Sequence, residues 1–194
     1  MRISLLTGVF VLAVAVQGTS QLPTGPIPAN PKEAAALATF TARVDDYVKL
    51  HRDLEGPVPT VRVSSDPAEI RAAMTALADK IREARPHAKQ GDFFTADIVT
   101  LFRRLIREGC GGQYKKLLEA VRDEAPPMAT PEVNGRWPDE APMTMMPPGV
   151  LCNLPQLPDE LEYRFVSRDL VLRDMHANLI VDVLVRAIPP GTWE

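Results

Sequence analysis

The segment that decides the fold lies near the C-terminus, where residues 161–174 read LEYRFVSRDLVLRD. Apolar and polar residues alternate with period two on either side of Ser167-Arg168, which predicts two strands joined by a two-residue turn. This register sets Glu162 opposite Arg173, whereas a turn one residue later would set Arg164 against Arg173. Charge pairing therefore favours the first register. It pairs apolar residues on one face: Phe165 with Leu170 and Tyr163 with Leu172.

A third apolar run follows this expected hairpin. Residues 179–185 read LIVDVLV and are rich in β-branched residues, which favours a third strand after a turn at Ala177-Asn178. A short buried helix is the competing interpretation, because periodicity does not separate the two at this length. The stretch LEYRFVSRDLVLRDMHANLIVD, residues 161–182, resembles the ending of exported bacterial proteins of unassigned function. That resemblance implies no activity and no site residue.

Residues 32–125 predict a core of four helices. Asn30-Pro31 is typical of a helix start, and Asp66-Pro67-Ala68-Glu69 combines a capping carboxylate with a proline and a glutamate in the first turn. A third helix is expected after Thr95 and a shorter fourth one after Gly112. The expected apolar faces are, in chain order: Leu37, Phe40, Val44, Tyr47, His51 and Leu54; Ile70, Met74, Leu77 and Ile81; Ile98, Leu101, Phe102, Leu105 and Ile106; Tyr114, Leu117, Leu118 and Val121.

The segment 126–160 has a different character, with nine prolines between Pro126 and Pro158. Such a density forbids a continuous helix or a central strand. Trp137 and Met146 nevertheless make it too apolar for a solvated linker, so it is either an extended wrap across the helices or a mobile linker. The predicted fold class is therefore α+β: a four-helix core, a proline-rich wrap, and a small antiparallel hairpin or meander over 161–194 that packs on the core.

The N-terminus predicts export. One positive charge at Arg2, an uncharged stretch from Ile3 to Val16, and small residues at Gly18 and Ser20 together form the pattern of a secretory signal over 1–20. The stretch is shorter than the ~20 apolar residues of a spanning helix, so cleavage is favoured over anchoring. Residues 21–31 form an extended lead-in. The expected location is the periplasm or the medium, with no membrane span after cleavage.

Net charge limits the class of partner, and the two cysteines predict a disulfide. A net charge of −3 provides no basic surface, which argues against a nucleic-acid partner. In an oxidising compartment Cys110 and Cys152 are expected to form a disulfide, whose loop of about 43 residues is worth roughly 4 kcal/mol. Two separate thiols are the alternative.

The densest polar cluster is Asp174-Met175-His176-Ala177-Asn178, with Asp182 beyond it. On a strand, the residues Asp174, His176 and Asn178 would share a face and could bind zinc or another divalent ion. The same residues are also suited to a hairpin turn, because Asp and Asn side chains bond to nearby backbone groups. The turn interpretation needs no ligand.

His51 is a further candidate, since it could meet Asp174 or His176 across the fold as an acid–base pair. The more common situation is a core histidine bonded to a backbone group. Carboxylates flank it in the sequence, at Asp45-Asp46 and at Asp53 and Glu55. A second group could form a soft metal site or simply pack: Met143, Met145 and Met146.

No nucleophile, phosphate-loop, dinucleotide or zinc-protease motif is present, and no cofactor is implied. The sequence therefore favours an exported, non-catalytic protein that binds an envelope partner or stabilises an assembly. The alternative is a small metal-dependent hydrolase that uses Asp174, His176 and Asp182, with His51. A third interpretation is a small-molecule carrier with a pocket between helices and sheet.

Overall fold

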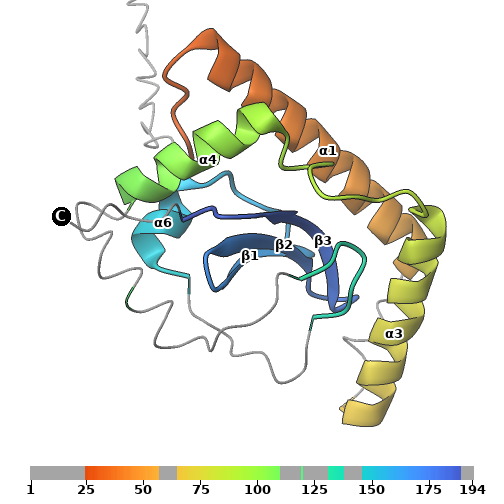
Figure 1. Ribbon diagram of the computed structural model, residues 1–194. Coiled ribbons are helices and arrows are strands. Elements are labelled where there is room, and N and C mark those ends of the chain that lie inside the picture. The colour runs from red at the N-terminus through yellow and green to blue at the C-terminus, as the bar shows by residue number, and fades with distance from the viewer. Residues whose placement is uncertain (1–24, 57–64, 110–118, 120–130, 138–145, 189–194) are drawn as a thin grey trace, which may run out of the picture.

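The computed structural model describes residues 25–56, 65–109, 119, 131–137 and 146–188 of the 194-residue chain. The predicted signal at 1–20, Cys110, Met143 and Met145 lie outside these ranges, as does the helix expected at 114–121 apart from residue 119. Within them, helices come first and a three-stranded antiparallel sheet follows (Figure 1). The mixed class is confirmed. The four-helix core and the proline-rich wrap are not confirmed, because only three of the described helices are substantial.

Helix α1 spans Pro31–Glu55 and supplies the long face against which the sheet packs. Its start follows from the sequence: the Oδ1 atom of Asn30 accepts the Glu33 N–H at 2.9 Å, and Pro31 occupies the first turn. The helix ends at Gly56, whose φ of 85° suits a residue without Cβ. The buried face contains Ala36, Phe40, Val44, Tyr47, Val48 and His51.

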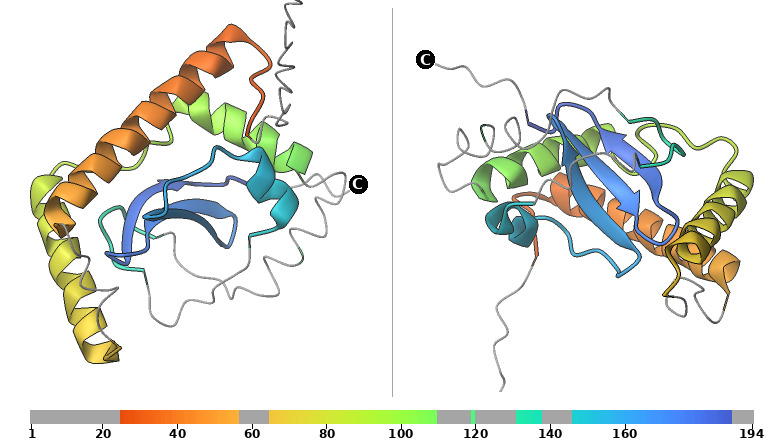
Figure 2. Two further views of the ribbon diagram at one scale, coloured as in Figure 1. Left: turned by 180° about the vertical axis from the view of Figure 1, so that it is seen from behind. Right: turned by 90° about the horizontal axis from the view of Figure 1, so that it is seen from below.

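Helices α3 (Pro67–Ala84) and α4 (Ala96–Gly109) differ in how much of their predicted faces they bury. All five apolar residues predicted for α4 are buried. In α3 only the C-terminal half is buried, at Leu77, Ala78 and Ile81, because this helix packs along the end of α1 and projects away from the sheet (Figures 1 and 2). The prediction of a continuous α3 stripe was therefore wrong at Ile70 and Met74, which are partly exposed.

A short helix, α6 (Pro148–Asn153), interrupts the proline-rich segment. Prolines at its first positions are compatible with a helix because their missing N–H groups have no partner there in any case. It crosses α4 where two glycines meet: a Cβ on Gly109 would lie 2.4 Å from the Gly149 carbonyl oxygen. Met146 packs in the core. Cys152 is an exposed free thiol in the structure. Because Cys110 lies outside the described residues, the disulfide between the two stays a prediction.

The sheet has the order β1 (Leu161–Val166), β2 (Asp169–Asp174), β3 (Leu179–Leu184). The predicted register is confirmed, with Glu162 opposite Arg173 and their side chains 2.7 Å apart. The third run is a strand, not a helix. Residues 134–137 continue along β3, where the Asn134 N–H donates to the Ile180 carbonyl at 2.8 Å.

The main core lies between the sheet and the layer formed by α1 and α4 (Figure 2). Phe102 of α4 illustrates the contact, since its ring meets the Tyr163 ring of β1 at 5.9 Å between centroids. A smaller cluster covers the other face of the sheet: Trp137, Val166, Val171, Ile180 and Val183. No helix in the described ranges is both long and apolar enough to span a bilayer.

Candidate functional site

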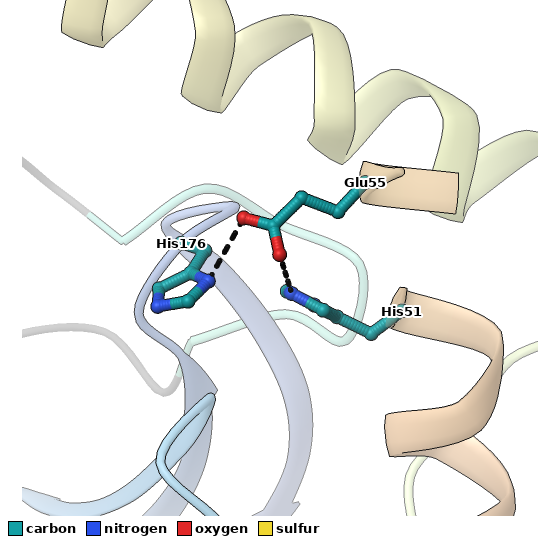
Figure 3. A group of neighbouring side chains, drawn as sticks. All are labelled: His51, Glu55 and His176. Atoms are coloured by element: carbon teal, nitrogen blue, oxygen red, sulfur yellow. Dashed lines mark hydrogen bonds and ion pairs between the residues drawn. The ribbon is translucent and has the colours of Figure 1, made fainter. Parts of the chain in front are cut away.

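A buried polar cluster forms where the C-terminal half of α1 meets the turn between β2 and β3. Helix α1 presents Tyr47, His51 and Glu55 one turn apart, which places all three on the face toward the sheet. Asp174 ends β2, and His176 lies in the turn at 175–178. The fold thus brings together residues that are more than 100 positions apart in the sequence (Figure 3).

Asp174 is the centre of the cluster and is 0% exposed. Its Oδ2 atom accepts the Tyr47 hydroxyl at 2.7 Å and lies 2.6 Å from Nδ1 of His51. Its Oδ1 atom accepts the Ala177 N–H at 2.8 Å, so the same carboxylate also closes the turn. Three partners compensate the burial of this charge. The contact fixes the His51 ring with Nδ1 toward Asp174 and Nε2 away from it.

Glu55 links the two histidines. Its Oε2 atom lies 3.3 Å from Nε2 of His51, and its Oε1 atom lies 3.0 Å from Nδ1 of His176. The imidazole rings of His51 and His176 are 5.3 Å apart between centroids. Figure 3 shows both rings pointing toward the Glu55 carboxylate. One ligand-capable atom from each of these three side chains lies within 4.8 Å of the others.

The surroundings shift two protonation equilibria. Burial lowers the pKa of His51, but the hydrogen bond and the charge of Asp174, together with Glu55, outweigh this and hold that pKa above its usual value. Burial, aided by the Asp174 charge, raises the pKa of Tyr47 well above its ordinary range. Tyr47 is therefore a neutral hydrogen-bond donor at physiological pH.

Asp182 lies outside this cluster, and its side chain binds backbone groups that hold the fold together. Its two carboxylate oxygens accept four backbone N–H groups at 2.7–2.9 Å, those of Gly91, Phe93, Phe94 and Val183. Through these bonds Asp182 fastens the loop before α4 to β3. Burial raises the pKa of Asp182 in spite of these donors. The Asp182 carboxylate therefore acts as a fixed anchor for that loop.

The candidates from the sequence are thus partly brought together. His51, Asp174 and His176 meet, whereas Asp182 binds backbone N–H groups elsewhere. The Asn178 side chain donates to the Trp137 carbonyl at 3.2 Å and accepts from the Arg173 guanidinium at 2.6 Å. His51 is fully buried, but its partners are carboxylates and not a backbone group. The turn interpretation of residues 174–178 is confirmed, and the turn itself delivers His176 to the cluster.

Sequence reasoning missed the roles of Glu55 and Tyr47. Their spacing of four residues on either side of His51 was the available signal, because it puts all three on one helix face. No protein-family model matches the chain, and neither a curated protein nor a solved structure is detectably similar to it.

Proposed function

We propose that this protein binds one divalent transition-metal ion of the zinc type, with His51, Glu55 and His176 as ligands. The observation that carries the proposal is the convergence of two imidazole nitrogens and a carboxylate oxygen within 4.8 Å of one another. A bound zinc ion would lie ~2.0–2.2 Å from each of these three atoms. Two histidines and one glutamate form an established zinc ligand set.

Asp174 supports this assignment from the second coordination shell. Ligating histidines usually donate their other ring N–H to a carboxylate, which fixes the tautomer and strengthens the ligand. Asp174 occupies that position on Nδ1 of His51, at 2.6 Å, and leaves Nε2 for the metal. Tyr47 in turn holds Asp174. Asp174 is therefore a positioning residue in this proposal and not a ligand.

Three protein ligands favour a catalytic site over a structural one. Structural zinc sites usually have four protein ligands, whereas catalytic sites keep one position for water. A zinc-bound water ionises near neutral pH and becomes a nucleophile. The side chains of Glu55 and His176 are 10% and 13% exposed, so the cluster is reached from solvent on their side. The activity proposed is metal-dependent hydrolysis by an exported protein.

This proposal modifies the expectations from the sequence. It keeps the hydrolase alternative, replaces Asp182 by Glu55, and moves Asp174 from ligand to positioning residue. It is preferred to the partner-binding role because that role was inferred from missing chemistry. Export and a periplasmic or secreted location remain part of the proposal and depend on the signal pattern over 1–20.

The competing explanation is a hydrogen-bond network that only holds α1 against the β2–β3 turn. Metal titration separates the two explanations. The mature protein is stripped with chelator, and zinc affinity is measured by competition with a chromophoric chelator. We expect one ion per chain, and at least about a 100-fold loss of affinity in His176→Ala.

The chain contains a matched control, because His87 is an exposed histidine far from the cluster in the sequence. His87→Ala should bind zinc as the unaltered protein does. Equal losses in the two variants, or less than one tenth of an ion per chain, would overturn the metal proposal. The hydrolytic activity is tested separately with p-nitrophenyl esters and phosphates, where turnover should require zinc and be lost in His176→Ala.

A further inference from the structure

A second candidate site lies where α1 meets the end of α3 and the loop before α4. There a hollow of about 400 Å³ is lined by α1 residues that include Arg43, Asp46 and Tyr47, and by Arg85 and Phe93. The α1 residues recur at spacings of three and four, so they share one helix face. This volume lies within the usual range for small-molecule pockets.

Arg85 is the most informative group in this hollow. Its guanidinium carbon lies 5.1 Å from the centroid of the Tyr47 ring and 5.5 Å from that of Phe93, which is cation–π geometry. Its hydrogen bonds are long, at 3.5 Å to Asn134 Oδ1 and 3.4 Å to the Val181 carbonyl. In the described part of the chain, no carboxylate forms an ion pair with it.

The positive charge of Arg85 is thus partly withdrawn from water, with carboxylates nearby but no direct ion pair in the described part of the chain. Burial lowers the pKa of Arg85, although four nearby groups act in the opposite direction: Tyr47, Asp92, Asp182 and Asp174. A guanidinium placed on two aromatic rings with its N–H groups weakly engaged is well suited to accept a carboxylate from a ligand.

Carboxylates also line the hollow, which restricts the ligand. Asp46 is exposed at its edge, and the Asp92 carboxylate accepts the Lys89 N–H at 2.9 Å. Arg43 donates to the Asp92 carbonyl. The two arginines and the two aspartates balance in formal charge, so the hollow favours neither a simple anion nor a simple cation overall. A ligand with adjacent charges of both signs matches all four groups.

We propose that this hollow binds a free α-amino acid with an apolar side chain. The ligand carboxylate lies on Arg85, its ammonium group lies at Asp46, and its side chain packs against the half-buried Leu50. The hollow and the proposed metal site adjoin at Tyr47, whose hydroxyl donates to Asp174. None of the three proposed metal ligands lines the hollow, and neither proposal depends on the other.

Calorimetry with the full mature chain tests the charge pattern directly. The probes are L-leucine, 4-methylpentanoate, which lacks the ammonium group, and 3-methylbutylamine, which lacks the carboxylate. We expect L-leucine to bind with a Kd below about 1 mM and each analogue to bind at least about tenfold more weakly. Failure of L-leucine to bind at about 10 mM, or equal binding of either analogue, would overturn the proposal.

Two variants locate the binding. Arg85→Met should weaken L-leucine binding at least about tenfold, whereas Arg71→Met, at an exposed position of α3, should not change it. Because Arg85 also packs on two rings, Asp46→Asn provides a test at an exposed side chain. It should weaken L-leucine but not 4-methylpentanoate. Unchanged L-leucine binding in both Arg85→Met and Asp46→Asn would contradict the assignment.

Discussion

At the scale of the residue, the Asp174 carboxylate connects the fold to the proposed chemistry. One oxygen holds the backbone of the β2–β3 turn, and the other holds Tyr47 and His51. The turn and the site therefore share a single buried charge. From the sequence, residues 174–178 could be either a turn or a ligand cluster. In the structure they form a turn and also contribute to the polar cluster.

Replacing Asp174 with Asn tests the positioning role. The amide cannot accept from all of the present donors, so the His51 ring loses its fixed orientation. We expect zinc affinity to fall about 10- to 100-fold, the range for second-shell groups. Tyr47→Phe removes one donor and leaves the His51 contact, so it should weaken zinc binding less. If Tyr47→Phe weakens zinc binding as much as Asp174→Asn, the positioning role of Asp174 is contradicted.

Asp182→Asn should lower the stability of the fold without changing zinc binding. An amide nitrogen there would face backbone N–H groups that need an acceptor, so we expect a loss of about 2 kcal/mol or more in unfolding free energy. Denaturant unfolding measures this loss. Zinc affinity, measured below the unfolding transition, should stay the same. A loss of zinc binding with unchanged stability would show that Asp182 belongs to the metal site.

The raised pKa of His51 has a consequence for stability in the absence of metal. Its folded-state pKa lies above the unfolded value of about 6.5. The protonated ring therefore stabilises the fold fully below that unfolded pKa, and this contribution is lost as pH rises through the folded pKa. In the presence of chelator, the unfolding free energy of the unaltered protein should exceed that of His51→Gln by more at pH 5.5 than at pH 8.5. A larger difference at pH 8.5 than at pH 5.5 in denaturant unfolding would contradict the raised pKa of His51.

At the scale of the element, the match between sequence and structure depends on how local the deciding interactions are. The β1–β2 register was predictable because charge pairing between Glu162 and Arg173 acts across adjacent strands. The α4 face was predictable because each of its residues meets the core. The α3 stripe failed at Ile70 and Met74, since helical periodicity does not say how far the partner element extends.

The crossing of α4 and α6 depends on two residues without side chains. A Cβ on Gly149 would lie 2.4 Å from the Gly109 carbonyl oxygen, which is backbone and cannot swing aside. Gly149→Ala should therefore destabilise the protein by about 1–3 kcal/mol. Leu151→Ala, on the exposed side of α6, should cost less than about 0.5 kcal/mol. Equal melting temperatures for the two variants would show that the helices do not cross this closely.

At the scale of the whole molecule, the site exists because the chain folds back on itself. Glu55 and His176 are 121 positions apart and meet only when α1 lies across the sheet. Each histidine could be proposed from the sequence, but their convergence could not, since periodicity describes single elements and not how they dock. The sheet that closes the core also delivers the turn, so assembly of the site and burial of the core are one event.

Anomalous diffraction at the zinc absorption edge, from crystals of the mature protein grown with one equivalent of zinc, tests the metal proposal most directly. We expect one strong peak about 2.0–2.2 Å from Nε2 of His51, Nδ1 of His176 and a Glu55 oxygen. The Asp174–His51 contact should persist beside it. A fully ordered cluster with no peak among these three side chains, or a peak only at other residues, would contradict it.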